Sequence, residues 1–388
     1  MVYGGGEVVF WNLARSLASR GHEVHVITQR VRGERDSETR SGVRIHRVGW
    51  PSEYAGALTT GFKDSFAYCV EAFFAGISIA AKRRVDVIHS NTYVPALVAQ
   101  LCASLLQKKH VMTVHDVYLL SLPWFWKTWS KQPDISFLAR VFGPLLETAL
   151  LKMPVTAIHT VSNASRNDIL RITKGRRVVV VPNGIQVADY VSKQGMAQAR
   201  TPQAIYVGRL VFYKNLEVVF QALTKVREKI RNVRVVIVGD GPMRVLWKSF
   251  VEKLGLQDQV AFFGRISHEE KVRLIHGSQF LVLPSLVEGF GMVVLEAYAC
   301  RKPVLASRIG ALQELVDADD GFLVDPASSD DWADRMVALF SNQGLALQMG
   351  DNGYAKLVER YTTGHVARAV ESMYVELLQE SRGTEGTS

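Results

Sequence analysis

The sequence contains few cysteines, and none is placed to bind a metal or to form a redox pair. Cys69, Cys102 and Cys300 lie far apart among apolar or small residues, with no CxxC spacing. This excludes a disulfide framework, and we expect reduced thiols in the core. The sequence also lacks an Asp-x-Asp pair after a predicted strand, so we expect neither a catalytic metal nor another cofactor.

Long apolar runs are lacking as well. No run approaches the ~18 residues that a membrane-spanning helix requires, and Met1 is not followed by a basic region and an apolar core. Charged residues make up 21% of the chain and apolar residues 48%, which leaves no room for extensive disorder. A chain of 388 residues with this composition predicts a cytoplasmic protein of two compact domains.

The positive charge is concentrated in the first half of the chain. Residues 1–200 contain 25 Lys and Arg against 14 Asp and Glu, while residues 201–388 contain 21 against 23. This asymmetry is compatible with an anionic partner, either a nucleic acid or an acidic membrane surface, and also with scattered solvated side chains. No nucleic-acid-binding motif is present, so we expect no nucleic acid partner.

Short β-branched runs alternate with longer helical patterns throughout the chain, which is typical of parallel sheets covered on both faces. At 187–202 polar residues, Gly and Pro replace the periodic apolar residues, so we place the linker there. The predicted fold class is α/β, with one doubly wound, Rossmann-like domain over 1–186, joined by a C-terminal helix at 364–388, and a second one over 187–363. The predicted strands are 23–28, 43–48, 85–90, 110–115, 155–161, 178–181, 204–207, 233–238, 260–263, 280–283, 303–306 and 321–324, and the predicted helices include 7–20, 95–107, 163–172, 215–230, 243–254, 267–276 and 291–300.

The first domain lacks one expected element. A sheet of this kind normally opens with an apolar strand that leads into its first glycine loop, yet only Met1, Val2 and Tyr3 precede Gly4-Gly5-Gly6. We expect that the innermost strand is missing and that the natural start of the chain lies upstream.

A glycine-containing loop precedes the predicted helix 291–300. Gly289 and Gly291 stand before its first turn, where free N–H groups and the positive end of the helix dipole bind anions such as phosphate. Glu288 lies in the loop and Glu296 in the second turn of the helix. Because carboxylates repel phosphate, we expect sugar hydroxyls as their partners; two solvent-facing glutamates are the plainer interpretation.

Two cations follow the predicted strand 204–207. Arg209 and Lys214 lie at the C-terminal end of this strand, where open parallel sheets bind ligands. Arg supplies a planar fork and Lys a mobile point charge, which suits a diphosphate whose charge grows as its bond to a sugar breaks. Solvated surface cations are the alternative interpretation.

Taken together in chain order, these segments resemble the large retaining family of GT-B glycosyltransferases, numbered family 4. The resemblance covers almost the whole chain, and no single motif decides it. Its motifs are Gly4-Gly5-Gly6-Glu7, Thr113-Val-His-Asp116, Val161-Ser-Asn163, Val181-Pro-Asn-Gly-Ile185, Gly208-Arg-Leu210 with Lys214-Asn215, Val238-Gly-Asp-Gly-Pro242, Phe263-Gly264, Pro284-Ser285, Glu288 and Glu296 with seven residues between them, and Gly321-Phe-Leu-Val324.

The resemblance implies a role for each matching position. Arg209 and Lys214 are expected to bind the donor diphosphate, and Glu296 the nucleotide ribose. Glu288 is expected to contact the transferred sugar as a catalytic residue. The remaining expected donor contacts are the N–H groups of Gly289, Phe290, Gly291 and Met292, the base-lining segment 264–267 with Ile266, and Gly5 and Gly6 near the phosphates.

His115 is the second expected catalytic residue. A histidine at a strand end is often only a hydrogen-bonded core residue, but the adjacent Asp116 and the C-terminal strand position favour a role at the reacting sugar. The resemblance implies a retaining hexosyltransferase whose active site is the cleft between the two facing domains. Its acceptor oxygen would attack on the face that the diphosphate leaves, and its catalysis would be electrostatic.

The acceptor side has an unusual composition. Trp124, Phe125, Trp126 and Trp129 stand beside Lys127 and Lys131, followed by the apolar helix 135–151. Interfacial tryptophans beside lysines are typical of a monotopic membrane contact, so a lipid-linked acceptor at the inner membrane face is one hypothesis. The alternatives are that these aromatics fill the core of the first domain or line an acceptor pocket; the acceptor is then expected to be a growing glycan or a lipid-linked molecule.

Two other functions compete with the transferase. Gly239-Asp-Gly-Pro-Met-Arg244 follows a strand as in a nicotinamide dehydrogenase, but Arg244 replaces the third glycine and the next strand ends in Phe263-Gly264 rather than in an acidic residue. The stronger rival is a non-catalytic module that binds a sugar nucleotide or a glycan. The presence of both glutamates and both cations favours the enzyme.

Overall fold

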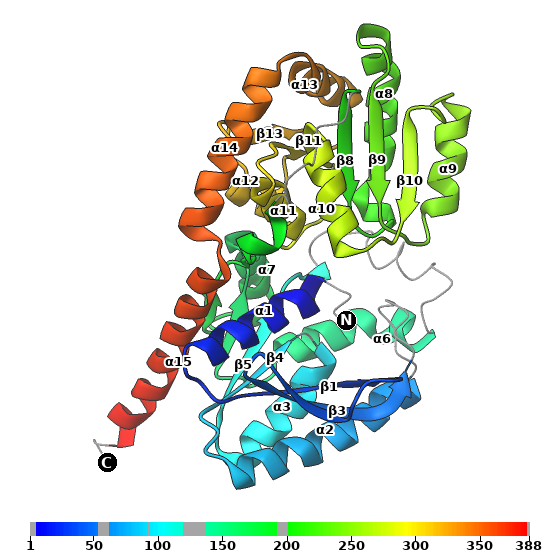
Figure 1. Ribbon diagram of the computed structural model, residues 1–388. Coiled ribbons are helices and arrows are strands. Elements are labelled where there is room, and N and C mark those ends of the chain that lie inside the picture. Colours follow the sequence, from blue (N-terminus) through cyan, green and yellow to red (C-terminus); the bar gives the residue numbers. More distant parts are fainter. Residues whose placement is uncertain (1–4, 53–61, 92, 119–136, 192–200, 386–388) are drawn as a thin grey trace. The chain divides into compact units, whose positions relative to one another are not determined.

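The computed structural model describes residues 5–52, 62–91, 93–118, 137–191 and 201–385 (Figure 1). The chain forms two compact units. Unit 1 comprises residues 1–183 and 363–388, and unit 2 comprises residues 184–362. The tryptophan-rich segment 119–136 and the first glycine, Gly4, lie outside the described residues.

Unit 1 contains two sheets. The larger one is parallel, with the order β4-β5-β6-β7, and the smaller one has the order β1-β3-β2 with only β2 antiparallel. β1 and β4 are edge strands of these two sheets, and among the described residues no strand lies between them and pairs with both. The strands are β1 (Val24–Val31), β2 (Ser37–Arg40), β3 (Val43–Ser52), β4 (Val87–Asn91), β5 (Lys109–Val114), β6 (Ala157–Thr160) and β7 (Val178–Val180).

Helices cover both faces of the larger sheet because the side chains of β5 alternate between two cores. Val111 packs with α1 (Gly5–Ser19) and with α15 (Thr363–Glu385), which returns from the far end of the chain. Met112 and Val114 face the opposite way. On that side the helices pack in succession, each on the next: α2 (Phe62–Lys82), α3 (Tyr93–Leu106), α6 (Phe137–Leu151) and α7 (Asn163–Thr173).

Unit 2 is built around one parallel sheet with the order β10-β9-β8-β11-β12-β13. The chain runs outward from β8 through β9 to β10 and then returns to the other side of β8, so the strand order reverses between β8 and β11. Ligands bind at such a switch point, beyond the carboxyl ends of the strands. The strands are β8 (Gln203–Val207), β9 (Arg234–Val238), β10 (Val260–Gly264), β11 (Phe280–Leu283), β12 (Val304–Ser307) and β13 (Gly321–Val324).

The helices of unit 2 follow its strands along the chain, and both units have the predicted doubly wound α/β class. Ser267 caps one of these helices, since its hydroxyl accepts a hydrogen bond of 3.1 Å from Glu270 N. The Glu270 carboxylate binds Arg273 instead of closing the capping box. The helices are α8 (Leu216–Lys229), α9 (Arg244–Lys253), α10 (His268–Gly277), α11 (Met292–Ala299), α12 (Gly310–Leu315), α13 (Ser329–Ser341) and α14 (Gln343–Arg360).

Two features of the structure were not expected from the sequence. Val187–Tyr190, placed in the linker, forms a 3-10 helix (η1) whose Tyr190 is only 6% exposed. The second is in α2, where the segment Asp64–Lys82 is long and apolar enough to cross a membrane by length and composition alone. Counting uninterrupted apolar residues missed this segment because Glu71 divides it.

Candidate active site

The loops after β8 and β11 meet at the switch point of unit 2. β8 and β11 are neighbours in the sheet, so the segments 208–215 and 284–291 leave it side by side. A hydrogen bond of 2.8 Å from Leu286 N to Tyr213 O joins the two loops. The first loop ends in a 3-10 turn, η2 (Phe212–Lys214), and Asn215 then adopts a left-handed conformation before α8 begins.

Lys214 and Glu288 come together at this point. The Lys214 ammonium is paired with the Glu288 carboxylate, and Ser285 Oγ donates a hydrogen bond of 2.9 Å to the same carboxylate oxygen. The two side chains are only 13% and 14% exposed. Burial lowers the pKa of Lys214, but the Glu288 carboxylate more than offsets this, so the net shift is upward and the ammonium keeps its charge.

Arg209 lies in the same loop and is held from two sides. Its guanidinium Nη2 donates a hydrogen bond of 3.1 Å to the Tyr213 hydroxyl, and its carbonyl accepts one of 2.9 Å from the buried Tyr206 hydroxyl. Lys214 Nζ lies 5.4 Å from the centre of the Tyr213 ring. Tyr213 therefore contacts both cations and positions them in one loop.

The start of α11 adds backbone donors on the β11 side. Gly291 precedes the helix with φ +95, a value that favours glycine, and a Cβ there would meet Leu312 Cδ2 at 2.8 Å. The first N–H groups of a helix, here from Met292 onward, have no intrahelical acceptor. The Phe290 ring is 7% exposed and packs against Tyr361, so only the backbone of Phe290 is available to a ligand.

Glu296 occupies a second buried position near the β11 end. Its Oε1 accepts hydrogen bonds of 3.1 Å from the Tyr190 hydroxyl and 2.8 Å from Lys271 Nζ. Its Oε2 is buried and has no hydrogen-bond partner among the described residues. Burial and the nearby Glu296 carboxylate raise the pKa of Tyr190, so this phenol stays protonated and donates. Glu296 is therefore not the solvent-facing glutamate of the plainer interpretation.

Tyr190 and Lys271 were not predicted from the sequence as site residues. Tyr190 lies in the predicted linker. The feature that could have indicated its role is that it is an aromatic residue in a polar stretch. Lys271 reaches Glu296 from α10, the helix that follows the base-lining segment expected at 264–267. In that segment Ile266 is half-buried and precedes α10, and Gly264 has φ +71.

Unit 1 brings together three other residues. His115 Nε2 lies 3.0 Å from Asn91 Oδ1, and a Cβ on Gly6 would lie 3.5 Å from the Asn91 amide and 3.7 Å from His115 Nε2. An amide oxygen only accepts, so this contact requires the proton on Nε2. Burial, and then the nearby His159, lowers the pKa of His115 to about 4, so the imidazole is neutral at pH 7. Asn91 was missed, although it ends the strand beside β5.

The glycines of the dehydrogenase-like motif have a structural role. Gly239 has φ +134, and a Cβ there would lie 1.8 Å from Gly208 O. A Cβ on Gly241 would lie 2.4 Å from Leu210 O, and Leu210 N donates to Asp240 O. The loop after β9 thus needs two glycines because the loop that carries Arg209 packs directly against it.

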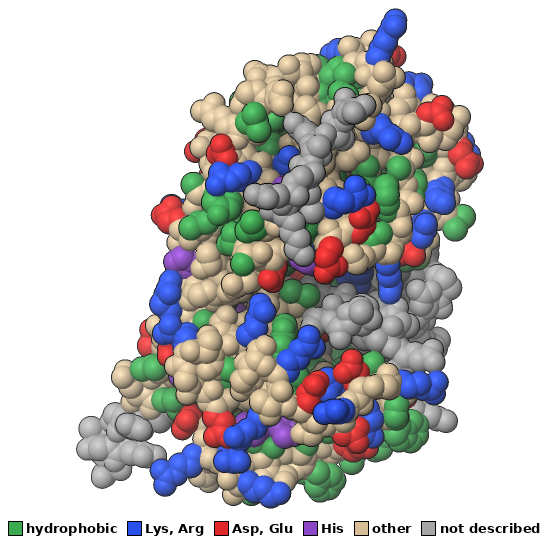
Figure 2. Space-filling view, in the orientation of Figure 1, with side chains coloured by type: hydrophobic (Ala, Val, Ile, Leu, Met, Phe, Trp, Pro, Cys, Tyr) green, Lys and Arg blue, Asp and Glu red, His purple; other side chains and the backbone are tan. Residues whose placement is uncertain are grey.

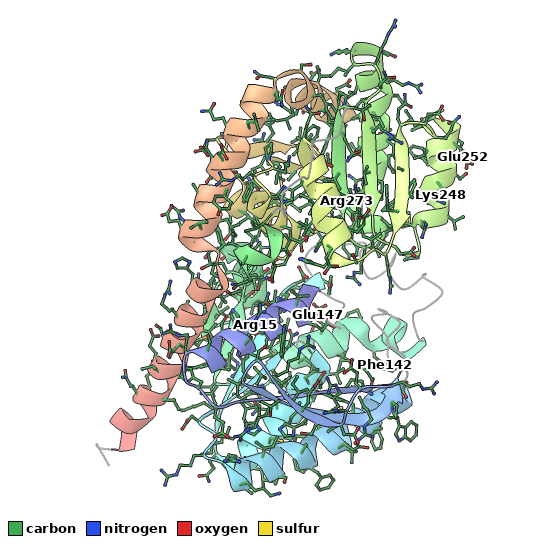
Figure 3. The ribbon with its side chains drawn as sticks, in the orientation of Figure 1. Arg15, Phe142, Glu147, Lys248, Glu252 and Arg273 are labelled. Carbon is green, nitrogen blue, oxygen red and sulfur yellow. The ribbon has the colours of Figure 1, made fainter. Side chains whose placement is uncertain are left out.

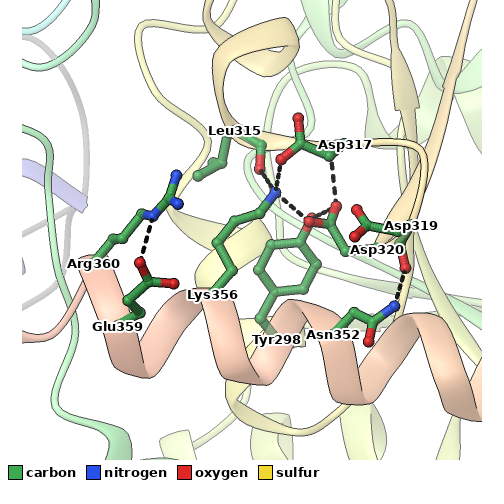
Figure 4. Close-up of polar contacts among 9 residues, drawn as sticks. All are labelled: Tyr298, Leu315, Asp317, Asp319, Asp320, Asn352, Lys356, Glu359 and Arg360. Carbon is green, nitrogen blue, oxygen red and sulfur yellow. Dashed lines mark hydrogen bonds and ion pairs between the residues drawn. The ribbon is translucent and has the colours of Figure 1, made fainter.

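An acidic group also lies away from the switch point. Asp317, Asp319 and Asp320 bring their carboxylates within 4.8 Å of one another, the grouping nearest to a metal site among the described residues. The Lys356 ammonium already lies among them and contacts both Asp317 and Asp320 (Figure 4). The Tyr298 hydroxyl donates a 2.5 Å hydrogen bond to Asp320. These contacts anchor α14 on α11 and β13.

Comparison with known proteins identifies the class. The family model described as "Glycosyl transferases group 1" matches residues 191–356, and the model described as "Glycosyltransferase Family 4" matches residues 3–189. The two matches together span both doubly wound units, which defines a glycosyltransferase of the GT-B type. The chain belongs to glycosyltransferase family 4.

Its relatives act on different substrates. The chain is 25% identical to N-acetyl-alpha-D-glucosaminyl L-malate synthase of Bacillus anthracis, over 98% of the chain and 96% of that protein. It is 26% identical to D-inositol 3-phosphate glycosyltransferase of Corynebacterium aurimucosum, over 97% and 91%. Among solved structures, sucrose-phosphate synthase from Thermosynechococcus elongatus matches with TM-score 0.79 at 23% identity, over 97% and 94% of the two chains. Anabaena HepE in complex with UDP-glucose matches with TM-score 0.71 at 18% identity, over 95% and 96%.

Proposed function

We propose that the chain is a retaining hexosyltransferase that moves a sugar from a nucleoside diphosphate sugar to a hydroxyl of an acceptor. The observation that carries this proposal is the convergence of Arg209, Lys214 and the start of α11 at the switch point between β8 and β11. Both cations contact Tyr213, Lys214 pairs with Glu288, and the loop of Glu288 leads into the positive end of α11. A departing diphosphate carries the charge that the two cations and the helix end stabilise.

The contacts of Glu296 support a nucleoside on the diphosphate. Tyr190 and Lys271 occupy its Oε1, while its Oε2 is a buried acceptor without a partner among the described residues. A buried carboxylate oxygen gains most from a hydroxyl donor, because an unsatisfied acceptor costs roughly 1–3 kcal/mol. We assign Oε2 to a ribose hydroxyl. HepE, which has the same fold, was solved with UDP-glucose, and this supports a sugar nucleotide as the donor.

In the proposed reaction the bond from the sugar C1 to the diphosphate oxygen breaks, and both electrons leave with the diphosphate. The acceptor oxygen bonds to C1 on the same face, and its proton passes to the departing phosphate. Glu288 is held by Lys214 and Ser285, which suits contact with the sugar more than nucleophilic attack. For neutral His115 we keep the expected contact with a sugar hydroxyl; because Asn91 Oδ1 accepts the Nε2 proton, His115 would take part in that contact as an acceptor through Nδ1.

For the acceptor we propose only a chemical class. The relatives named above include an N-acetyl-alpha-D-glucosaminyl L-malate synthase and a D-inositol 3-phosphate glycosyltransferase, so relatives differ in the acceptors that their names give. For this chain we propose an acceptor hydroxyl on a growing glycan or on a lipid-linked molecule. No metal or other cofactor enters the proposed step.

A screen of UDP-, GDP- and ADP-sugars by thermal shift tests the proposal. One class should stabilise the protein, by roughly 2.7 kcal/mol at a hundredfold excess over its Kd. The same donor should then be hydrolysed slowly without an acceptor, with release of the nucleoside diphosphate. Stabilisation without any hydrolysis or transfer would instead indicate the rival function, a non-catalytic sugar-nucleotide module. No stabilisation by any of the three classes would contradict the donor site itself.

A further inference from the structure

The helices α2, α3 and α6 of unit 1 present apolar side chains outward. Of the 18 large hydrophobic side chains exposed among the described residues, ten belong to these three helices. A surface helix normally points such residues into the core. The ten are Phe66, Val70 and Phe74 on α2; Val94, Leu97, Leu101 and Leu105 on α3; and Phe142, Leu145 and Leu146 on α6.

The spacing makes each set a continuous stripe. On α2 the exposed residues recur every four positions, and on α3 they recur every three or four, so each set follows one side of its helix. Because α2 packs on α3 and α3 on α6, the three stripes lie next to one another. In Figure 2 hydrophobic side chains lie along the lower edge of the view, over the position of α2 in Figure 1. We call the combined surface the α2–α3–α6 face.

Two acidic side chains of these helices accept hydrogen bonds from backbone N–H groups. The Glu71 carboxylate of α2 accepts a hydrogen bond of 2.8 Å from Gly49 N in β3. On α6 Glu147 is 3% exposed and accepts one of 2.8 Å from Tyr118 N, while Phe142 is 50% exposed (Figure 3). α3 carries no charged residue. On α6, therefore, an acid is buried while three large apolar side chains are exposed, although Leu150 and Leu151 at the end of the helix are buried.

A row of cations borders the face at one edge. The helices α2, α3, α6 and α7 all end at the edge where the parallel strands β4 to β7 begin. The connections between them, together with the first residue of β5, contain one acid, Asp86, and eight cations. Two of these cations, Arg83 and Arg177, are paired with the acids Glu23 and Glu380. The eight are Arg83, Arg84, Lys108, Lys109, Lys152, Lys174, Arg176 and Arg177.

The helix dipole accounts for only part of this row. A cation near the C-terminus of each helix is stabilising, which explains about one per helix. An excess of eight to one is larger than that. Lys152, Lys174 and Arg176 also line a shared hollow with Arg171 at the ends of α6 and α7. A phosphate headgroup matches this arrangement in charge.

We propose that the α2–α3–α6 face docks on an anionic phospholipid bilayer as a monotopic contact. The apolar stripes would enter the acyl boundary, and the row of cations would lie at the headgroups. A second copy of the chain fits less well, because its own row, with one acid against eight cations, offers little counter-charge. A spanning α2 also fits less well, because its inner side supplies Ala72 to the core cluster with Val48 and Val98. This proposal does not rest on the proposed function.

Vesicle co-sedimentation of the full chain tests the proposal. We expect binding to phosphatidylglycerol–phosphatidylcholine vesicles about tenfold tighter than to phosphatidylcholine alone, and weaker binding at about 0.5 M NaCl. The double variant Leu101→Asp, Leu145→Asp should lose at least about tenfold in affinity, since two anchors are removed and two negative charges added. These side chains are 61% and 67% exposed, so the fold should persist. The matched control is Leu347→Asp on α14, 53% exposed in unit 2, which should bind as the unmodified chain does.

Several outcomes would overturn the proposal. One is unchanged vesicle binding by the double variant. Another is a dimer of the unmodified chain that the double variant loses, which would assign the face to a second copy. Resistance to carbonate extraction would indicate a spanning helix. Hydrogen exchange on the unmodified chain gives a test that needs no variant: vesicles should protect residues 93–106, and absence of protection there would also reject the proposal.

Discussion

At the scale of single residues, the proposed donor site is defined by the ion-pair partner of each charged side chain. Lys214 forms an ion pair with Glu288, and Lys271 forms one with Glu296. The two carboxylates beside the proposed anion site therefore add no uncompensated negative charge. The sequence predicted the four partners Arg209, Lys214, Glu288 and Glu296 as neighbours of one ligand. It did not predict that the glutamates and lysines would pair with one another, because these pairs join different loops.

Lys214→Ala should lower kcat by roughly a hundredfold to a thousandfold, because it removes one preorganised positive charge from the departing diphosphate. Arg209→Ala should lose a similar factor. Steady-state kinetics with the donor found in the screen measures both.

The control for both variants is Lys225→Ala. This lysine of α8 is 40% exposed and ion-paired with Asp330, so its loss should leave kcat within about twofold, as is usual for exposed ion pairs. Near-normal turnover of the Lys214 variant would remove the diphosphate assignment.

At the scale of elements, the site depends on how loops pack at the edge of the sheet. The loop after β9 packs against the loop after β8 at Gly239 and Gly241. A glycine motif that resembles a dinucleotide-binding loop therefore supports the neighbouring loop. Sequence spacing could not distinguish these roles, because both require glycine where two backbones, or a backbone and a ligand, approach closely.

Gly239→Ala should destabilise unit 2 by more than about 2 kcal/mol, since a Cβ would overlap Gly208 O and φ +134 is strained for alanine. Donor affinity should fall as well, because the loop with Arg209 is displaced. Urea unfolding and the thermal-shift assay measure the two effects.

Gly344→Ala is the control for this variant. Its Cβ would lie 3.5 Å from Asn342 Oδ1, near the start of α14, so the change should be neutral or slightly stabilising. Equal stability of the Gly239 and Gly344 variants would show that the close approach at Gly208 does not matter.

At the scale of the whole molecule, unit 1 carries a chain of buried histidines through its sheet. Thr113 Oγ1 lies 2.6 Å from His89 Nε2 and 2.9 Å from His159 Nδ1, which links β4, β5 and β6. His89 Nδ1 lies 2.5 Å from the Tyr374 hydroxyl, which adds α15. Burial lowers the pKa of His110 and of His159 to about 4, and both are neutral in the fold.

Unit 1 should therefore lose stability as the pH falls from 6.5 towards 4. In this window the unfolded chain binds protons that the folded chain does not, so the free energy of unfolding decreases with acidification and levels off above pH 6.5. Each such histidine contributes on the order of 1.4 kcal/mol per pH unit. Calorimetry from pH 7.5 to 5 measures the slope.

His159→Gln should reduce the slope of the free energy of unfolding against pH by the contribution of one histidine, about 1.4 kcal/mol per pH unit. The reason is that one proton-binding group is removed from the unfolded chain. His268→Gln, at an exposed position of unit 2, should leave the slope of unit 1 unchanged. A pH-independent free energy of unfolding between pH 7 and 5 would contradict the buried neutral network.

The sequence alone determined the alternation of strands and helices, the α/β class and the family, because periodicity and strand-end motifs are local in the chain. Only the tertiary structure decided that Tyr190 donates to Glu296, 106 residues further on, and that Glu147 of α6 is buried while apolar side chains of the same helix are exposed. The direction of a side chain depends on which surface packs against its helix. That surface comes from distant parts of the chain, so local sequence does not contain it.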